Sequence, residues 1–481
     1  MIFLFAQIAK QPQRFDCLKH PVILQLESFE FVSFHVISLV LFILAIIHTL
    51  SANRVRAWAR SFEASQAPKR RGKKWEKSLL VHFFYFLSEI EVIFAFWAIP
   101  LVVSMIFFYG WKMGLEYINT RDYTEPLFVA IILSLTATRP IVQIAETIIQ
   151  GCAKCLGSSL AAWWFALLTV GPLLGSFITE VGAMTLCALL LSRQFYEFHP
   201  SENLAYATIA LLFVNISVGG ILTDFASPAV LVLAHCWHWT SIDMFLIFGW
   251  KAIWGIVLSN LIYWLFFRKE FKALNQKKRH LASAHLLHSL KEKEMPIPKW
   301  VTITHILFIV WIVIVAHYTA IFIASYLFFI GFHQATRPHQ YAIRLVQPML
   351  VGLFLAGLVI HSGLQAWWVI QLFQGLNALS VMGVAILLTG FNDNVAISYL
   401  STLIPNWSDA MKYALFTGVI AGGGLTVIAN APNPAGYSIL QKHFSGGIKF
   451  LRLFLMALGP TLLLYLIFFV FGPLGVFGNN S

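Results

Sequence analysis

The chain has 481 residues, of which 59% are hydrophobic and only 11% are charged, with a net charge of +12 at pH 7. This is too little charge to cover a soluble protein of this length, and the continuous apolar runs exclude a transmembrane β-barrel. The composition indicates an all-α polytopic membrane protein with about ten to twelve transmembrane helices of roughly 20 residues each.

Two clusters of basic residues indicate how the chain is organised. Residues 53–78 and 268–299 hold nine Lys and Arg residues each, out of 33 in the whole chain. Cytoplasmic loops concentrate positive charge, so both segments are predicted to be cytoplasmic, and the charge does not indicate nucleic-acid binding. The predicted organisation is an N-terminal helix with a basic loop (1–78), a first transporter repeat (79–268), a basic cytoplasmic linker (269–299) and a second transporter repeat (300–476).

Four short motifs occur once in each half of the chain, in the same order. The matching segments are Ala-Thr-Arg-Pro at 137–140 and 335–338, Ala-Trp-Trp at 162–164 and 366–368, an acidic segment at 180–183 and 393–396, and Gly-Gly-x-Leu-Thr at 219–223 and 422–426. An internal duplication in an apolar chain is typical of secondary transporters, whose substrate site lies where the two repeats meet.

Lone acidic residues lie between apolar segments of each repeat. Glu180 and Asp393 each follow one apolar segment and precede another, so each is predicted to lie at a turn. Ionisable groups at membrane depth are costly and mark functional sites. Burial favours the protonated carboxyl and a bound cation favours the ionised one, so cation and proton compete for such a group. The alternative is a carboxylate tied to a helix N-terminus or to an arginine.

Glycine, threonine and proline interrupt an apolar segment near the end of each repeat, at 219–228 and 422–434. Such sequence does not continue a helix, and broken backbone at membrane depth survives only where it is buried in protein or lines a cavity. We therefore expect a broken helix at a binding site in each half. The predicted ion- and proton-binding residues are Thr179, Glu180, Thr223, Asp224, Asn392, Asp393, Asn394, Thr426, Asn430 and Asn433.

Other charged residues have weaker functional signals. Arg139 and Arg337, each before a proline, are candidates for gating or for anion contact, although a structural ion pair or helix-end anchor is favoured. Glu89 and Glu91 lie two residues apart on a predicted helix, so at most one faces a cavity. Motifs for ATP hydrolysis or familiar hydrolases do not occur, and we predict neither an enzyme, a cofactor nor a transition-metal site.

One pair of segments resembles a known family. The stretch Gly-Phe-Asn-Asp-Asn-Val-Ala at 390–396, followed by Ala-Asn-Ala-Pro-Asn-Pro at 429–434, is similar to the ion-transporter superfamily. Within it, the chain most resembles the bacterial sodium/proton antiporter branch, over about residues 79–476. The resemblance implies a bacterial inner-membrane protein with two inverted repeats, each with a re-entrant hairpin and a broken helix. It also implies a homodimer with moving transport domains.

The direction of the repeats stays open. Two cytoplasmic basic segments require an even number of crossings between the repeat starts, and hence parallel repeats. Inverted repeats require an odd number. The amphipathic stretch at 140–157 either lies on the membrane surface or crosses it, and this choice changes the count.

The sequence as a whole favours a sodium/proton antiporter that works by alternating access, with monovalent cations, protons and membrane lipid as partners. Dicarboxylate carriers of the resembled superfamily have neutral hairpin tips, whereas Glu180 and Asp393 place negative charge near the tips expected here. The alternatives are an anion, dicarboxylate or oxyanion transporter that uses Arg139 and Arg337, and a membrane protein without transport activity, such as an intramembrane enzyme or scaffold.

Overall fold

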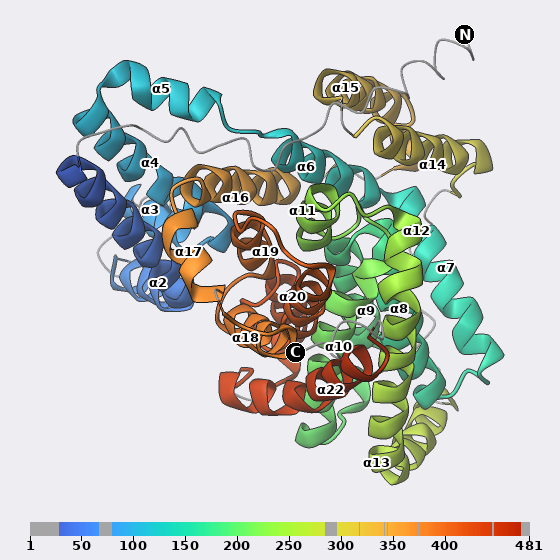
Figure 1. Cartoon of the computed structure of the whole chain (residues 1–481). Coiled ribbons are helices and arrows are strands. Elements are labelled where there is room, and N and C mark those ends of the chain that lie inside the picture. The colour runs from blue at the N-terminus through green and yellow to red at the C-terminus, as the bar shows by residue number, and fades with distance from the viewer. Residues whose placement is uncertain are drawn as a thin grey trace.

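The computed structural model describes residues 28–66, 79–283 and 296–472, apart from 317, 341, 344, 374, 445 and 446. Regular structure in these segments is helical, and none of their residues forms a strand (Figure 1). The predicted all-α class is therefore confirmed. The first 27 residues and part of each basic segment, at 67–78 and 284–295, lie outside the described residues.

Several helices are long and apolar enough to cross a membrane, which makes the chain a multi-pass membrane protein. Within the described segments there are five such spans, or up to seven if each of two sharply bent helix pairs counts as one span. Four further apolar helices have 10–17 residues. The expected ten to twelve crossings therefore stay a prediction.

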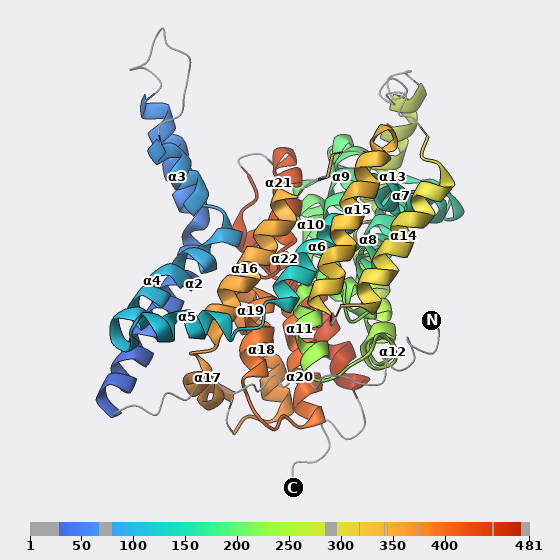
Figure 2. The same ribbon diagram turned by 90° about the horizontal axis from the view of Figure 1, so that it is seen from above.

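The N-terminal helices pack along one side of the molecule together with a helix from the second half (Figure 2). They are α2 (Ser28–Gln66), α3 (Leu79–Leu87), α4 (Ile90–Tyr109) and α5 (Trp111–Asn119), and the partner from the second half is α16 (Val346–Ser362). Phe94 on α4 contacts Phe354 of α16, with ring centroids 5.4 Å apart. The two halves of the sequence are therefore not two separate lobes.

The first half continues with further helices, some of which begin at a side-chain cap. They are α6 (Thr124–Thr136), α7 (Arg139–Cys155), α8 (Leu160–Ile178), α9 (Glu180–Gln194), η2 (Tyr196–Phe198), α10 (Glu202–Gly219), η3 (Gly220–Leu222) and α11 (Pro228–Cys236). Ser159 accepts a hydrogen bond from Ala162 N, and Ser201 accepts one from Leu204 N, so each satisfies a free donor in a first helical turn. The axes of α6 and α7 bend by 66° at the Ala-Thr-Arg-Pro motif.

The second half begins after a long helix that runs into the basic linker. Before it lie α12 (Ser241–Asp243) and the π-helix η4 (Met244–Gly249), and the long helix is α13 (Trp250–Ser283). The remaining helices are α14 (Lys299–Ile314), α15 (Thr319–Ala335), η5 (Arg337–His339), α17 (Ala366–Phe373), α18 (Ala378–Phe391), α19 (Asn394–Thr402), α20 (Asp409–Gly422), α21 (Asn433–Leu440), η6 (Gln441–His443) and α22 (Phe450–Val470).

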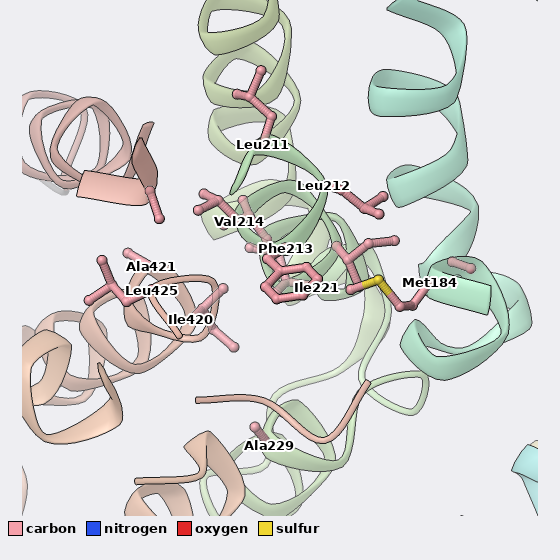
Figure 3. Close-up of a cluster of buried hydrophobic side chains, with 14 of the residues drawn as sticks. Met184, Leu211, Leu212, Phe213, Val214, Ile221, Ala229, Ile420, Ala421 and Leu425 are labelled. Atoms are coloured by element: carbon pink, nitrogen blue, oxygen red, sulfur yellow. The ribbon is translucent and has the colours of Figure 1, made fainter. Parts of the chain in front are cut away.

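The core lies where the two halves meet. Helix α10 is buried from Leu204 onward, and α20 is buried from Tyr413 onward. Figure 3 shows Phe213 of α10 in a cluster that also holds Ile420 of α20. Ser217 Oγ on α10 donates to the carbonyl oxygen of Ile420 at 2.8 Å. The two helices with predicted interruptions thus meet in the centre of the protein.

Candidate functional site

Glu180 lies at a sharp turn between two packed helices. Helix α8 ends at Ile178 and α9 begins at Glu180, while Thr179 between them has a φ of +67° and caps α9 by accepting from Gly182 N at 3.4 Å. A positive φ is unfavourable for a β-branched residue, so the surrounding packing holds this turn in place. A Cβ added at Gly175 would lie 3.4 Å from the Cβ of Ala183, so the chain folds back tightly. Glu180 is 0% exposed.

Asp393 lies at a comparable break between α18 and α19. It is the N-cap residue of α19, with its Oδ1 accepting from Val395 N at 2.8 Å, and it is 6% exposed. The side chain of Asn392 accepts a hydrogen bond from Asp393 N at 2.9 Å. One oxygen of Asp393 is therefore tied to a helix N-terminus, which was the structural alternative to ion binding.

The first broken helix packs directly against the turn that carries Glu180. After α10 and η3, the backbone is extended at Thr223, and α11 starts at Pro228. Thr223 Oγ1 donates to the carbonyl of Ser176, in the last turn of α8, at 2.6 Å. A Cβ added at Gly220 would overlap Oε1 of Glu180, so only glycine allows the broken backbone to come this close to the carboxylate.

The second broken helix makes the corresponding contact in the other half. Thr426 Oγ1 donates to the carbonyl of Gly390, in the last turn of α18, at 2.9 Å. Between α20 and α21, the amide of Asn433 donates to the carbonyls of Gly423 and Thr426, at 2.8 Å each. The threonine of each Gly-Gly-x-Leu-Thr motif thus fastens a helix break to the helix that precedes the acidic residue.

Contacts between the halves close the site. Helix α21, after the second break, packs on α9, and α11, after the first break, packs on α19. Asn430 Nδ2 donates to Oε2 of Glu180 at 3.0 Å. Within the second half, Asn394 N donates to the carbonyl of Ala429 at 3.0 Å. The acidic residue of the first half is therefore held by the broken helix of the second.

Several buried oxygens at this junction have no hydrogen-bond partner. They are Glu180 Oε1, Ser227 Oγ, Asn394 Oδ1, Asn430 Oδ1 and Asn433 Oδ1. Among the described residues, no Lys or Arg forms an ion pair with Glu180 or Asp393. A buried ionised carboxylate without a counter-charge is strongly unfavourable, so this site requires a bound cation or a proton. Oxygen donors suit a hard cation such as Na⁺.

A small cavity lies beside the junction. Its volume is about 20 Å³, which is room for one water molecule or a small ion. It is lined by Glu91, Val351, Phe354, Asp393, Ile428, Asn430, Ala431 and Pro434. Glu89, by contrast, forms an ion pair with Arg56 at 2.9 Å. Glu91 therefore lines the cavity and Glu89 does not, as expected for two residues on different faces of a helix.

Three of the predicted site residues have other surroundings. Asp224 accepts a hydrogen bond from the hydroxyl of Ser241. Arg139 Nη1 donates to the carbonyl of His339 at 3.1 Å, and Arg337 is exposed at the start of η5. The two arginine segments therefore meet each other, and neither arginine lines the cavity.

Two residues near the junction are not among the predicted ion- and proton-binding residues, although the sequence offers both as weaker candidates. Ser227 precedes the proline that starts α11, and its hydroxyl is buried without a hydrogen-bond partner. Its position beside a helix break was the available signal, but many serines in this chain lie near glycine or proline. Glu91 precedes both predicted hairpins in the sequence, so only the packing of α4 reveals that its carboxylate shares a cavity with Asp393.

Comparison with known proteins assigns the family. The family described as "Putative Na+/H+ antiporter" matches residues 33–471, and the chain belongs to it. This membership makes the chain a multi-pass membrane protein of a cation/proton transporter family, rather than of an enzyme family. No curated protein matches the chain. Among solved structures, it is similar to the YdaH transporter of Alcanivorax borkumensis, described as having an unusual topology. The two are 14% identical with a TM-score of 0.38, over 79% of this chain and 96% of that one.

Proposed function

We propose that the protein is a sodium/proton antiporter in which cation and proton compete for Glu180 and Asp393. The observation that carries the proposal is the burial of the Glu180 carboxylate without a counter-charge. Its carboxylate is fully buried at the junction of the two helix breaks, one oxygen has no hydrogen-bond partner, and the described residues give it no basic ion-pair partner. Only a mobile positive charge neutralises it there.

The residues around Glu180 have distinct roles in this proposal. Asn430 Nδ2 holds Oε2 of the carboxylate, which leaves Oε1 for the transported ion. The partnerless oxygens of Asn430 and Ser227 supply neutral ligands, and Asp393 supplies a second negative charge. When the cation leaves, a proton on Oε1 removes the buried charge. The cation-bound form and the protonated form carry the same total charge, so either can cross the membrane. The empty ionised form carries one more buried negative charge and is held back.

Alternating access requires that this junction move relative to a fixed part of the protein. We propose that the moving unit holds the two hairpins and broken helices. The fixed unit holds α2, α4 and α16, in which α4 packs on both of the others. The cavity between Glu91 of α4 and Asp393 lies on the boundary of these units. We also propose repeats at 79–268 and 300–476, the N-terminal segment 1–78 and the linker 269–299 as the organisation of the chain.

The proposal also covers the location and the oligomeric state of the protein. We propose a homodimer in the inner membrane of a bacterium, surrounded by lipid, with the basic segments in the cytoplasm. The anion-transporter alternative is less favoured, because the carboxylates lie at the junction and the cavity lining includes neither Arg139 nor Arg337.

Purified protein in proteoliposomes with an interior pH dye tests the function. Addition of external Na⁺ or Li⁺ should move protons, and dicarboxylates should not compete. The variant Glu180→Gln should lose this exchange. Glu197→Gln, at an exposed site of η2, is the control and should retain it. Saturable dicarboxylate uptake without cation-driven proton movement would reject the proposal in favour of an anion transporter. Absence of both fluxes in well-folded protein would favour a membrane protein without transport activity.

A further inference from the structure

Glu91 lies opposite the hairpin junction, on a different part of the structure. It is in the first turn of α4, which packs against α2 and α16. Its Oε1 accepts a hydrogen bond from Nε2 of Gln347, which lies in the first turn of α16. No cation forms an ion pair with it among the described residues, because the nearby Arg56 is bound to Glu89.

The cavity joins Glu91 to the proposed transport site. Glu91 and Asp393 both line it, so the two carboxylates border the same space. Asn430 lines the same cavity, is 1% exposed, and has a side-chain oxygen without a hydrogen-bond partner. Since the amide nitrogen of Asn430 donates to Glu180, this asparagine connects the cavity that Glu91 lines with the buried carboxylate of Glu180.

We propose that Glu91 is a relay carboxylate, which binds the cation or proton transiently on its way between solution and Asp393. The inference rests on the proposed function and adds a third ion-handling site, outside the two hairpins. The groups that face it are Asp393 from the hairpin tip, Asn430 from the helix break, and Gln347 from α16. Arg56 of α2 and the flanking Glu89 form a separate pair beside them.

A relay role differs in its kinetics from a role in holding α4 to α16. Glutamine at position 91 keeps a hydrogen-bonding partner for Gln347 but removes the negative charge. A relay carboxylate raises the local cation concentration, so its loss weakens apparent affinity and is overcome by saturating cation. A structural contact, once lost, lowers the maximal rate or the stability at every cation concentration.

The test compares Glu91→Gln, Glu91→Asp and the control Glu197→Gln, at an exposed site of η2, in the proteoliposome assay across pH and Na⁺ concentration. Glu91→Gln should raise the half-saturating Na⁺ concentration about tenfold, on the scale of one lost charge contact, and should shift the pH profile. Glu91→Asp should recover most of the affinity, and Glu197→Gln should match the parent. Parental half-saturation and pH profile in Glu91→Gln would overturn the relay.

Failure of the relay and failure of the antiporter proposal give different results. If the parent protein shows no cation-driven proton movement, the antiporter proposal fails and the relay falls with it. If the parent exchanges ions and Glu91→Gln behaves identically, only the relay fails. In the unmodified protein, Na⁺ should also slow the reaction of a hydrophobic carbodiimide with Glu91, followed by peptide mass spectrometry. Labelling of Glu91 that is insensitive to Na⁺ would likewise overturn the relay, whether or not the variants fold.

Discussion

Asn430 donates a hydrogen bond to Glu180 at 3.0 Å across a sequence separation of 250 residues. This contact joins the broken helix of the second half to the acidic turn of the first. It occupies one carboxylate oxygen and leaves the other without a partner in a fully buried position. The same asparagine lines the cavity that holds Glu91 and Asp393. A single side chain therefore links the buried carboxylate of Glu180 to the cavity.

Asn430→Ala should impair both binding and stability. Removal of the amide leaves Oε2 of Glu180 buried without its donor, which costs about 1–3 kcal/mol when the carboxylate is ionised. We expect a lower melting temperature and weaker apparent Na⁺ affinity in the same protein. Low pH should relieve the stability loss, because protonation removes the buried charge. Thermal unfolding at several pH values checks this, and a loss that does not depend on pH would argue against a charged Glu180.

Glycine at position 220 is predicted to be essential for the same junction. A Cβ at this position overlaps Oε1 of Glu180, and overpacking of this kind typically costs about 1–3 kcal/mol. Gly220→Ala should therefore lower the exchange rate and the melting temperature. Gly151→Ala on α7 is the matched control, because an added Cβ there meets nothing within 4 Å. Parental exchange in Gly220→Ala would show that the carboxylate lies elsewhere in the working protein.

The two acidic residues should differ in role. Asp393→Asn retains a good N-cap for α19, so the variant should fold. We expect it mainly to weaken apparent cation affinity, whereas Glu180→Gln should remove the pH dependence and lower coupled exchange by about 100-fold. Initial rates across Na⁺ concentration and pH separate the two effects. Parental rates and pH profiles in both well-folded variants would reduce both acids to structural roles.

The basic segments should lie in the cytoplasm. Cysteines introduced at Ser65 and Ser283, at the ends of α2 and α13, should resist impermeant thiol reagents in intact cells. The background requires replacement of the five native cysteines. Labelling of either introduced cysteine from outside would show that its segment is external, and would change the count of crossings between the repeats.

The sequence was most informative where a local signal determines local structure. Glycine and proline do not support a continuous helix, so the ends of α10 and α20 could be placed within a few residues. Lone acids between apolar segments marked the turns at Glu180 and Asp393, because an ionisable group is costly inside an apolar membrane helix. Each of these expectations depends on residues that are neighbours in the chain.

Contacts between distant residues lay beyond such reasoning. Asp224 and Thr223 are adjacent and equally polar, yet the threonine fastens α8 while the aspartate pairs with Ser241. Only the fold decides which side faces the junction. The bond between Asn430 and Glu180, and the approach of Glu91 to Asp393, depend on packing between the halves, for which no local pattern exists.

Competition between Na⁺ and protons for Glu180 is the central claim, and proton release on Na⁺ binding tests it most directly. Purified protein in a weakly buffered solution with a pH dye should release protons when Na⁺ is added at a pH where Glu180 is protonated. Release should fall as the starting pH rises, and Glu180→Gln should lose most of it while Glu197→Gln keeps it. Na⁺ binding without proton release, or undiminished release from Glu180→Gln, would contradict the account.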